Sequence, residues 1–161
     1  WLDMDMLVVG LDGKGGPSSD LGGVGCTYTE YQTQMSMWCM FASPLAVSHD
    51  ILNENAETRR ILLNKEIIAI NQDALGEAAH RVDFRGSCRV YLRNLSGNRQ
   101  AIAIMNPSDT PQRVQLPLSI LGNAKEYNFR DVWEHKTSRQ RKAWQGTLQP
   151  HETKVFTVTT R

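Results

Sequence analysis

The stretch Trp1-Leu2-Asp3-Met4-Asp5-Met6-Leu7-Val8-Val9-Gly10 opens the chain, and the interpretation of the remaining residues depends on it. A continuous apolar run from Met6 to Val9 stops at a glycine, a pattern typical of a strand that is buried on both faces. Asp3 and Asp5 precede the run, and a strand would project both carboxylates from one side. At a strand end they could face a sugar, a phosphate or a metal. The alternative is a pair of solvated turn aspartates before a core strand.

Length and composition are those of a globular protein. The chain has 161 residues, of which 40% are hydrophobic and 22% are charged, and these values exclude global disorder. No apolar run approaches the ~20 residues that cross a bilayer, so we expect no membrane partner. No signal peptide is visible. The chain opens on Trp1, within an apparent strand, and we therefore expect a piece of a longer polypeptide.

The charge is distributed unevenly along the chain. Residues 1–78 carry 4 Lys/Arg and 11 Asp/Glu, whereas residues 79–161 carry 14 and 6. This break in composition predicts a domain boundary at about residues 77–79. The arginines of the basic half alternate with apolar residues, as in Arg89, Val90 and Arg93. Such alternation is typical of a solvated strand face, and we expect no nucleic-acid partner.

The segment that follows the first strand is rich in glycine. Residues 10–25 hold seven glycines in sixteen positions, but they match neither of the common phosphate-binding loop motifs. We expect a rim loop at the carboxyl end of the first strand. Thr27-x-x-Glu30 is a capping box, which predicts the start of a helix that ends at Ser43-Pro44.

A second strand and two further helices complete the first half. Leu45–Ser48 has the pattern of a short buried strand, and His49 and Asp50 follow at its carboxyl end. These two residues either belong to a site or cap the next loop. Helices are predicted over about 56–64 and 66–71, so the order strand, helix, strand, helix indicates α/β structure with parallel pairing.

From His80 onward the hydrophobic period changes to two. Short strands separated by turn residues at roughly ten-residue spacing predict an antiparallel sandwich. The predicted strands cover residues 81–84, 88–94, 100–105, 112–118, 125–132 and 153–159.

Cysteine and histidine spacing gives no metal-binding motif, so we expect no metal site. Cys26, Cys39 and Cys88 lack the spacing of metal ligands and are expected to be small buried residues. Asn94-Leu95-Ser96 is a glycosylation sequon, which has meaning only in a eukaryotic secretory protein.

Three segments, taken together, resemble a known family. They are Trp1-x-Asp3-x-Asp5-Met6-Leu7, the end of the long helix at Ser43-Pro44-Leu45, and the run NKEIIAINQDALG over residues 64–76. In this order they are similar to the carboxyl half of α-galactosidases and α-N-acetylgalactosaminidases of glycoside hydrolase family 27. Downstream, Arg130-Asp131-Val132-Trp133 and Leu148-x-Pro150-His151 resemble the β-domain of that family.

The resemblance implies a fold and an activity. Residues 1–78 would be the last two βα units of a (β/α)8 TIM barrel, and residues 79–161 an antiparallel β-sandwich. The whole protein would be a retaining exo-glycosidase for terminal α-D-galactosyl residues that needs no cofactor, and would be secreted, periplasmic or lysosomal. Its partners would be an α-galactoside or related sugar and the missing amino-terminal part of the barrel. Both catalytic aspartates of the family lie on earlier strands, so this chain would hold no catalytic residue and be inactive alone.

The resemblance also implies site residues. Asp5 and Met6 match positions that line the galactose pocket at the carboxyl face of the barrel, and Trp1 and Asp3 match residues that flank it. Leu2 and Met4 stand where the family has Asn and Pro, and Ala74 also replaces a Pro. The substrate could therefore be a galactoside, an N-acetylgalactosaminide or an arabinopyranoside.

Two other interpretations stay open. The chain could be a carbohydrate-binding β-sandwich with a vestigial α/β lead-in, in which Tyr91, Trp133 and Trp144 stack on sugar rings. It could also have a purely structural role.

Overall fold

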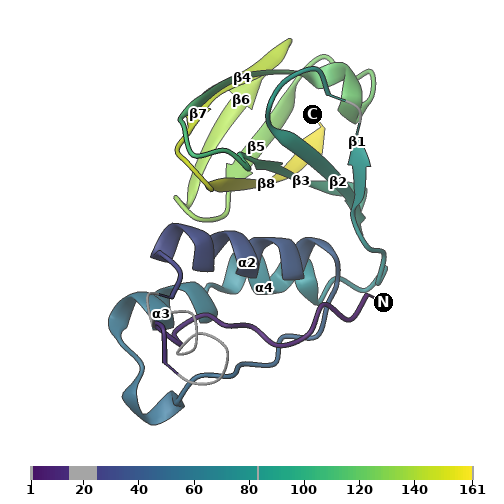
Figure 1. Cartoon of the computed structure of the whole chain (residues 1–161). Coiled ribbons are helices and arrows are strands. Elements are labelled where there is room, and N and C mark those ends of the chain that lie inside the picture. Colours follow the sequence, from purple (N-terminus) through teal and green to yellow (C-terminus); the bar gives the residue numbers. More distant parts are fainter. Residues whose placement is uncertain (1, 15–24, 83, 161) are drawn as a thin grey trace.

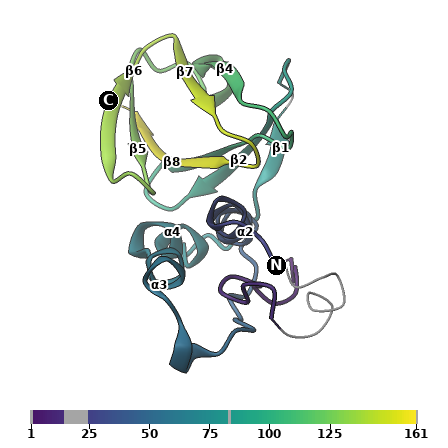
Figure 2. The ribbon, with the colours of Figure 1, turned by 60° about the vertical axis from the view of Figure 1, so that its left-hand side comes forward.

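The computed structural model describes residues 2–14, 25–82 and 84–160, and these form three layers (Figure 1). The β-sheets lie on one side, helices α2 and α4 lie in the middle, and the extended segments around residues 7 and 47 lie on the other side. The turned view in Figure 2 shows the same order. The helices are therefore covered on both sides. No helix in the described part of the chain is long and apolar enough to span a membrane.

Helix α2 (Tyr28–Met40) confirms the predicted capping box. The Thr27 hydroxyl accepts the Glu30 N–H at 3.3 Å, and the Glu30 carboxylate accepts the Thr27 N–H at 2.8 Å. The helix ends just before Ala42, whose φ of 54° lies in the left-handed region. The Ser43 N–H then donates to the Trp38 carbonyl at 3.0 Å, which closes the helix end.

Asparagine caps separate the two short helices that follow. Asn55 caps α3 (Ala56–Leu62), and its side-chain oxygen accepts the Thr58 N–H at 2.9 Å. Asn64, which was expected inside this helix, instead caps α4 (Lys65–Asn71). An asparagine side chain satisfies free N–H groups at a helix start better than it supports a helix interior, so the boundary falls two residues early. A 3-10 turn, η1 (Ile51–Asn53), had not been predicted.

The two predicted parallel strands are reduced to one bridge. Leu7 pairs with Val47 in the expected parallel direction, through bonds from the Leu7 N–H to the Ala46 carbonyl (2.7 Å) and from the Ser48 N–H to the Leu7 carbonyl (3.2 Å). The prediction of full strands over 6–9 and 45–48 was wrong for this chain. A strand needs neighbours to satisfy its backbone groups, and two short segments provide only one pair.

The strands of the second half form two antiparallel sheets. The larger has six strands in the order β1-β2-β3-β8-β5-β6, and the smaller pairs β4 with β7. Their bounds are β1 His80–Val82, β2 Arg89–Leu95, β3 Arg99–Met105, β4 Gln112–Pro117, β5 Tyr127–Asp131, β6 Lys136–Gln140, β7 Ala143–Leu148 and β8 Thr153–Thr160, with a 3-10 turn, η2, at Leu118–Leu121.

Strands β6 and β7 were missed by the sequence analysis. Strand β6 lies at a sheet edge and is almost wholly exposed, so it carries no hydrophobic alternation. Strand β7 contains Gly146, which weakens the strand pattern. A Cβ at Gly146 would lie 2.4 Å from the Trp144 ring, so the packing of that indole excludes a side chain there.

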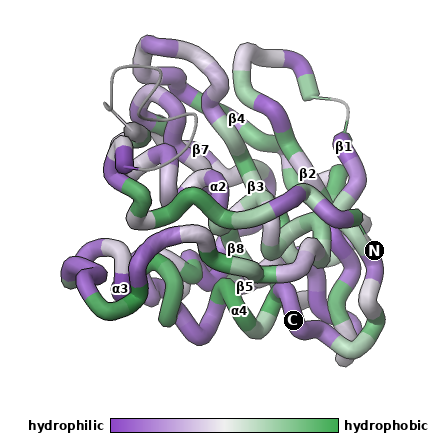
Figure 3. Tube along the Cα trace, turned by 60° about the horizontal axis from the view of Figure 1, so that its bottom comes forward, coloured by the Kyte–Doolittle hydropathy of each residue, from purple (hydrophilic) through white to green (hydrophobic). Residues whose placement is uncertain are grey.

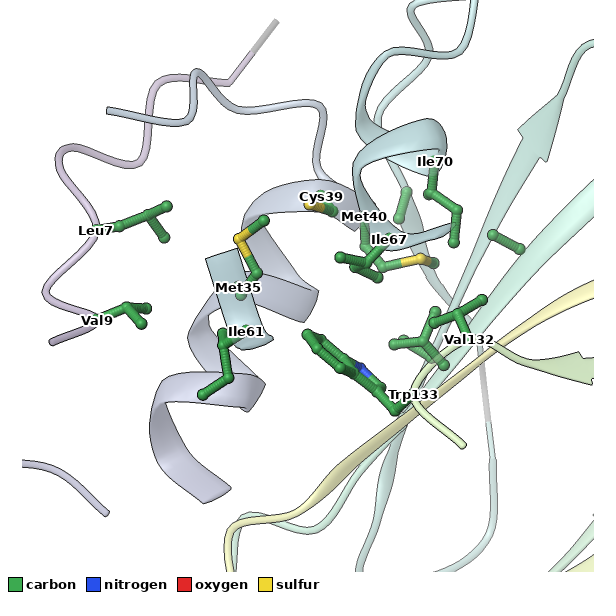
Figure 4. Packing of buried hydrophobic residues seen from close by; sticks show 14 of the residues in the cluster. Leu7, Val9, Met35, Cys39, Met40, Ile61, Ile67, Ile70, Val132 and Trp133 are labelled. Atoms are coloured by element: carbon green, nitrogen blue, oxygen red, sulfur yellow. The ribbon is translucent and has the colours of Figure 1, made fainter. Parts of the chain in front are cut away.

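Two hydrophobic clusters hold the chain together. One fills the space between the two sheets and is built around residues such as Ile102, Phe129 and Trp144. The other lies between the helices and the outer face of the six-stranded sheet (Figure 4). In it Leu7, Met35 and Ile67 share one core with Val132 and Trp133. Figure 3 shows the amino-terminal segment changing from hydrophilic near its end to hydrophobic where it enters this cluster.

The prediction that the arginines of the basic half lie on a solvated strand face was wrong for Arg93. Arg89 is exposed as expected, but Arg93 is fully buried rather than part of a solvated face. Strand β2 places Val90 and Leu92 in the cluster between the sheets, whereas Tyr91 and Leu95 pack in the cluster against the helices. Since both faces of this strand are covered at Arg93, the alternation of Arg and apolar residues did not indicate exposure there.

Candidate functional site

Residues 2–6 form a turn and not a strand. The Asp3 carboxylate accepts the Asp5 N–H at 3.0 Å, and Asp5 itself has a φ of 69°. The Asp5 carboxylate in turn accepts the Met6 N–H at 2.7 Å. The two carboxylates therefore do not project from one side of a strand, because local side-chain bonds to the backbone bend the chain. The alternative of turn aspartates before a core segment describes this geometry.

Two bonds from the end of helix α2 hold this turn. The Trp38 indole N–H donates to the Asp5 carbonyl at 2.8 Å, and the Met4 N–H donates to the Ser43 hydroxyl at 3.0 Å. The left-handed conformation of a non-glycine residue costs free energy and persists only where the surroundings enforce it. Such residues cluster at functional sites, but five other described non-glycine residues share a positive φ. The conformation therefore supports Asp5 as a candidate only together with its place in the sequence motif.

The structure describes three of the four predicted site residues. Asp3, Asp5 and Met6 are all exposed, and Met6 leaves 46% of its surface open. Trp1 lies outside the described residues, as does most of the glycine-rich segment, residues 15–24. The Leu7–Val47 bridge shows the direction of the chain at Leu7. Because the backbone turns at Asp5, that direction does not determine where the Asp5 carboxylate points.

A polar cleft lies on the carboxyl side of the Leu7–Val47 bridge. It measures about 370 Å³ and is lined by Asp12, Lys14, His49 and residues 53–55, among others. His49 and Asp50 were predicted as possible site residues from the sequence, whereas the other residues that line this cleft were not. The sequence did contain a signal for them. The segments after residues 9 and 48 each follow a predicted parallel strand, and the carboxyl ends of parallel strands meet at one edge of a sheet.

Asp50 and His49 have different surroundings in this cleft. The Asp50 carboxylate accepts bonds from the Asn53 side chain (2.6 Å) and the Leu52 N–H (3.0 Å), which lower its pKa. Asp50 therefore caps the next loop. His49 is buried, with its Nε2 3.3 Å from the Glu54 carboxylate.

Carboxyl groups elsewhere in the described chain are engaged in structural bonds. A bond from the Thr27 backbone lowers the pKa of Glu30, and the Arg130 guanidinium lowers that of Glu66. Burial acts to raise the pKa of Asp73, but bonds from the Ser96 N–H and hydroxyl outweigh it and leave the pKa lowered. A general acid needs a raised pKa, so these three are unsuited to protonate a leaving group.

The aromatic residues of the sugar-stacking hypothesis are packing residues. Trp133 and Trp144 are only 8% and 7% exposed. The Trp133 indole donates to the Ser36 hydroxyl at 3.0 Å, across the interface between helices and sheet. Tyr91 packs edge-on against Phe41, with ring centroids 5.5 Å apart. Trp133 and Trp144 are buried and the half-buried Tyr91 packs on Phe41, so the structure does not favour this hypothesis.

Cysteine chemistry contributes little to any site. Cys39 is buried, which raises the pKa of its thiol to about 12, and Cys88 is buried as well. Cys26 is exposed, contrary to expectation, because it lies just before the helix cap. Among residues 2–14, 25–82 and 84–160, no three His, Cys, Asp or Glu side chains gather as a metal site would require.

Two family models match the chain in succession. Residues 1–73 match the model described as alpha galactosidase A, and residues 85–158 match the alpha galactosidase C-terminal beta sandwich domain. Together they cover most of the sequence.

Individual proteins agree with the family models. Alpha-galactosidase 3 of Arabidopsis thaliana is 31% identical over 99% of this chain and 35% of its own length. A crystal structure from Bacteroides fragilis, of a candidate α-galactosidase/melibiase, is 38% identical with a TM-score of 0.89, over 99% of this chain and 34% of that one.

A more distant structure shares the fold. It is a family 27 β-L-arabinopyranosidase from Geobacillus stearothermophilus in complex with arabinose, 24% identical with a TM-score of 0.85, over 100% of this chain and 38% of that one. The chain thus spans about a third of the length of the relatives it matches.

Proposed function

Because the chain belongs to the α-galactosidases of glycoside hydrolase family 27, we propose that it is part of a retaining exo-glycosidase for terminal α-D-galactosyl residues. The observation that carries the proposal is the likeness of nearly the whole chain to α-galactosidases, in sequence and in fold. The order of the two family models along the chain supports a division near residue 78, with a carboxyl portion of a (β/α)8 barrel before it and a β-sandwich after it.

The proposed chemistry needs residues outside this chain. Retaining glycosidases use two carboxyl groups about 5 Å apart, one as nucleophile and one as acid and base. By the family resemblance, both catalytic aspartates lie on earlier strands of the barrel. We therefore assign them to the part of the protein upstream of this chain, and no catalytic role to this chain. The lowered pKa values of Glu30, Glu66 and Asp73 agree with this assignment.

The proposed substrate contacts are Asp5 and Met6, with Asp3 and Trp1 beside them. The motif match carries this assignment, and the enforced left-handed conformation and exposure of Asp5 support it. An exposed carboxylate can accept a sugar hydroxyl in a charge-assisted bond, and an exposed apolar side chain such as Met6 can pack on the sugar ring. Asp3 orders the turn through its bond to the Asp5 N–H.

The proposed macromolecular partner is the remaining part of the barrel. An apolar groove of about 310 Å³ beside the Leu7–Val47 bridge is lined by Leu45, Val47, Ile51 and Leu63, among others. Ile51 and Leu63 are 64% and 62% exposed, which is unusual for residues beside a core. Further strands and helices of the same barrel would cover these side chains.

The experiment compares two proteins. The 161-residue chain and the longer protein that contains it are purified and assayed with an aryl α-galactoside. We expect hydrolysis by the longer protein alone, and NMR of the first product formed should show the α-anomer, because retention preserves the configuration. Turnover by the 161-residue chain would overturn the assignment of the catalytic residues. A β-anomeric first product would overturn the retaining mechanism.

A further inference from the structure

A single buried arginine of the sandwich touches the ends of two helices. Arg93 of β2 is fully buried, and its Nη1 donates to the Cys39 carbonyl at 2.5 Å. Its Nη2 lies 3.5 Å from the Asn71 carbonyl. Cys39 is in the last turn of α2, and Asn71 is the last residue of α4. Carbonyl groups at helix carboxyl ends carry partial negative charge, so both ends suit a cation.

From these two helix ends, hydrogen bonds continue to the turn at Asp5. The Asn71 side chain donates to the Ser43 carbonyl at 2.8 Å, and the Ser43 hydroxyl accepts the Met4 N–H. On the other path, the last turn of α2 carries both Cys39 and Trp38, and the Trp38 indole donates to the Asp5 carbonyl. Both paths therefore begin at Arg93 and end at the backbone on either side of the Met4–Asp5 peptide.

The surroundings of Arg93 indicate that it positions the two helix ends and adds little to the free energy of unfolding. Its Nε has no hydrogen-bond partner among the described residues, and the acceptors of its other nitrogens are neutral carbonyls. Burial lowers the pKa of the guanidinium, although the nearby Asp73 carboxylate acts to raise it. Taking a guanidinium out of water without a bonded carboxylate is costly, so a hydrophobic side chain could stabilise this position as well.

We infer that Arg93 is a positioning residue through which the β-sandwich fixes the sugar-binding turn at Asp5. This inference rests on the proposed function, since the turn matters to the reaction only if Asp5 contacts the substrate. It gives the sandwich a specific task in the enzyme. The guanidinium locks the ends of α2 and α4, and these in turn hold Met4 and Asp5 in the bent conformation that presents the Asp5 carboxylate.

The test uses the longer protein and a matched control. Arg93→Met removes the bonds to both helix ends, and Arg93→Lys keeps one cationic donor. Arg130 is the control, because it crosses the same interface to Glu66 (2.7 Å) in the first turn of α4, at the opposite end of that helix from Asn71 and the Asp5 turn. Amide exchange at Met4 and steady-state kinetics with an aryl α-galactoside are measured for Arg93→Met, Arg93→Lys and Arg130→Gln.

We expect Arg93→Met to accelerate exchange at Met4 and to raise KM about tenfold, which corresponds to ~1.4 kcal/mol of lost binding. Arg93→Lys should recover part of both effects, and Arg130→Gln should change neither. Ser43→Ala cuts one of the two paths beyond Arg93 and leaves the sandwich and the Trp38 path intact. It should therefore accelerate exchange at Met4 and reproduce part of the rise in KM even if Arg93→Met fails to fold. Unchanged exchange at Met4 in Arg93→Met, or an equal rise in KM for Arg130→Gln, would overturn the inference. If Arg93→Met does not fold, exchange at Met4 in Arg93→Lys that equals the wild type while Ser43→Ala also leaves KM unchanged would overturn it.

The proposed function and the positioning role of Arg93 are tested by different results. If the longer protein hydrolyses no galactoside, the proposed function falls, while exchange at Met4 still decides whether Arg93 holds the turn. If hydrolysis occurs and Arg93→Met and Ser43→Ala leave KM unchanged, the positioning role falls and the proposed function stands.

Discussion

The indole N–H of Trp38 donates to the backbone carbonyl of Asp5 at 2.8 Å, so a residue of the packing face of α2 also fixes the chain at the candidate site. Trp38 also packs against the hydrophobic cluster between the helices and the six-stranded sheet. Its polar atom connects the helix to a turn that would otherwise be free to unbend, since the left-handed conformation at Asp5 is unfavourable without support.

Asp5→Asn in the longer protein tests the substrate contact. A charge-assisted bond to a sugar hydroxyl contributes about 1.5–3 kcal/mol, so its weakening should lower kcat/KM by roughly 10- to 100-fold. The Asn side chain keeps the acceptor for the Met6 N–H, and the melting temperature should barely change. Steady-state kinetics and thermal melts measure both. Glu134→Gln, a change at an exposed carboxylate that pairs with the exposed Lys136, is the control. Normal kcat/KM in Asp5→Asn would make Asp5 a structural residue.

Asp3 should affect stability through the turn. Asp3→Ala removes the acceptor of the Asp5 N–H, and we expect a loss of about 0.5–1.5 kcal/mol in the free energy of unfolding. Asp3→Asn retains an acceptor oxygen and should stay close to wild type. Denaturant unfolding of the two variants measures the difference. Equal stabilities of the Ala and Asn variants would show that the bond is not formed in solution.

The sequence predicted those helices and strands whose signals lie in neighbouring residues. The capping box located α2, and alternation with turn residues located six of the eight strands, because those signals need only neighbouring residues. Strand β6 escaped because an exposed edge strand has no apolar face. The burial of Arg93 escaped because it depends on helices packing on the second face of the sheet. The bend at Asp5 depends on Trp38, which lies 33 positions away.

Hydrogen exchange of the isolated 161-residue chain tests the proposed division near residue 78. Strands β3 and β8 pair with each other and contribute to both hydrophobic clusters, so their amides should be the most protected. Residues 5–9 and 45–48 share one bridge and border an open apolar groove, so their amides should exchange much faster. Equal protection in the two halves would contradict a division into an independent sandwich and an incomplete barrel.

His151 should make stability depend on pH. Its Nδ1 lies 2.8 Å from the Glu30 carboxylate of α2, and its Nε2 lies 2.9 Å from the Asp109 carboxylate of the turn between β3 and β4. Ionised carboxylates only accept hydrogen bonds, so both contacts form only when both ring nitrogens carry protons. The bond to Glu30 and then that to Asp109 raise the pKa of His151 above its ordinary value of about 6.5. Because the folded pKa is raised, the stabilisation is complete below the unfolded pKa and is lost as pH rises through the folded pKa.

The measurement is the melting temperature of the wild type and of His151→Asn between pH 5 and pH 8. Asparagine tolerates the left-handed φ of 59° at this position but does not titrate, which separates charge from backbone conformation. The neighbouring Glu152 pairs with Lys154 at 3.1 Å and is unchanged in both proteins. We expect the wild type to exceed the variant at pH 5 and the difference to shrink toward pH 8. A difference that is constant with pH would mean that folding does not raise the pKa of His151, and the double contact would then be ruled out.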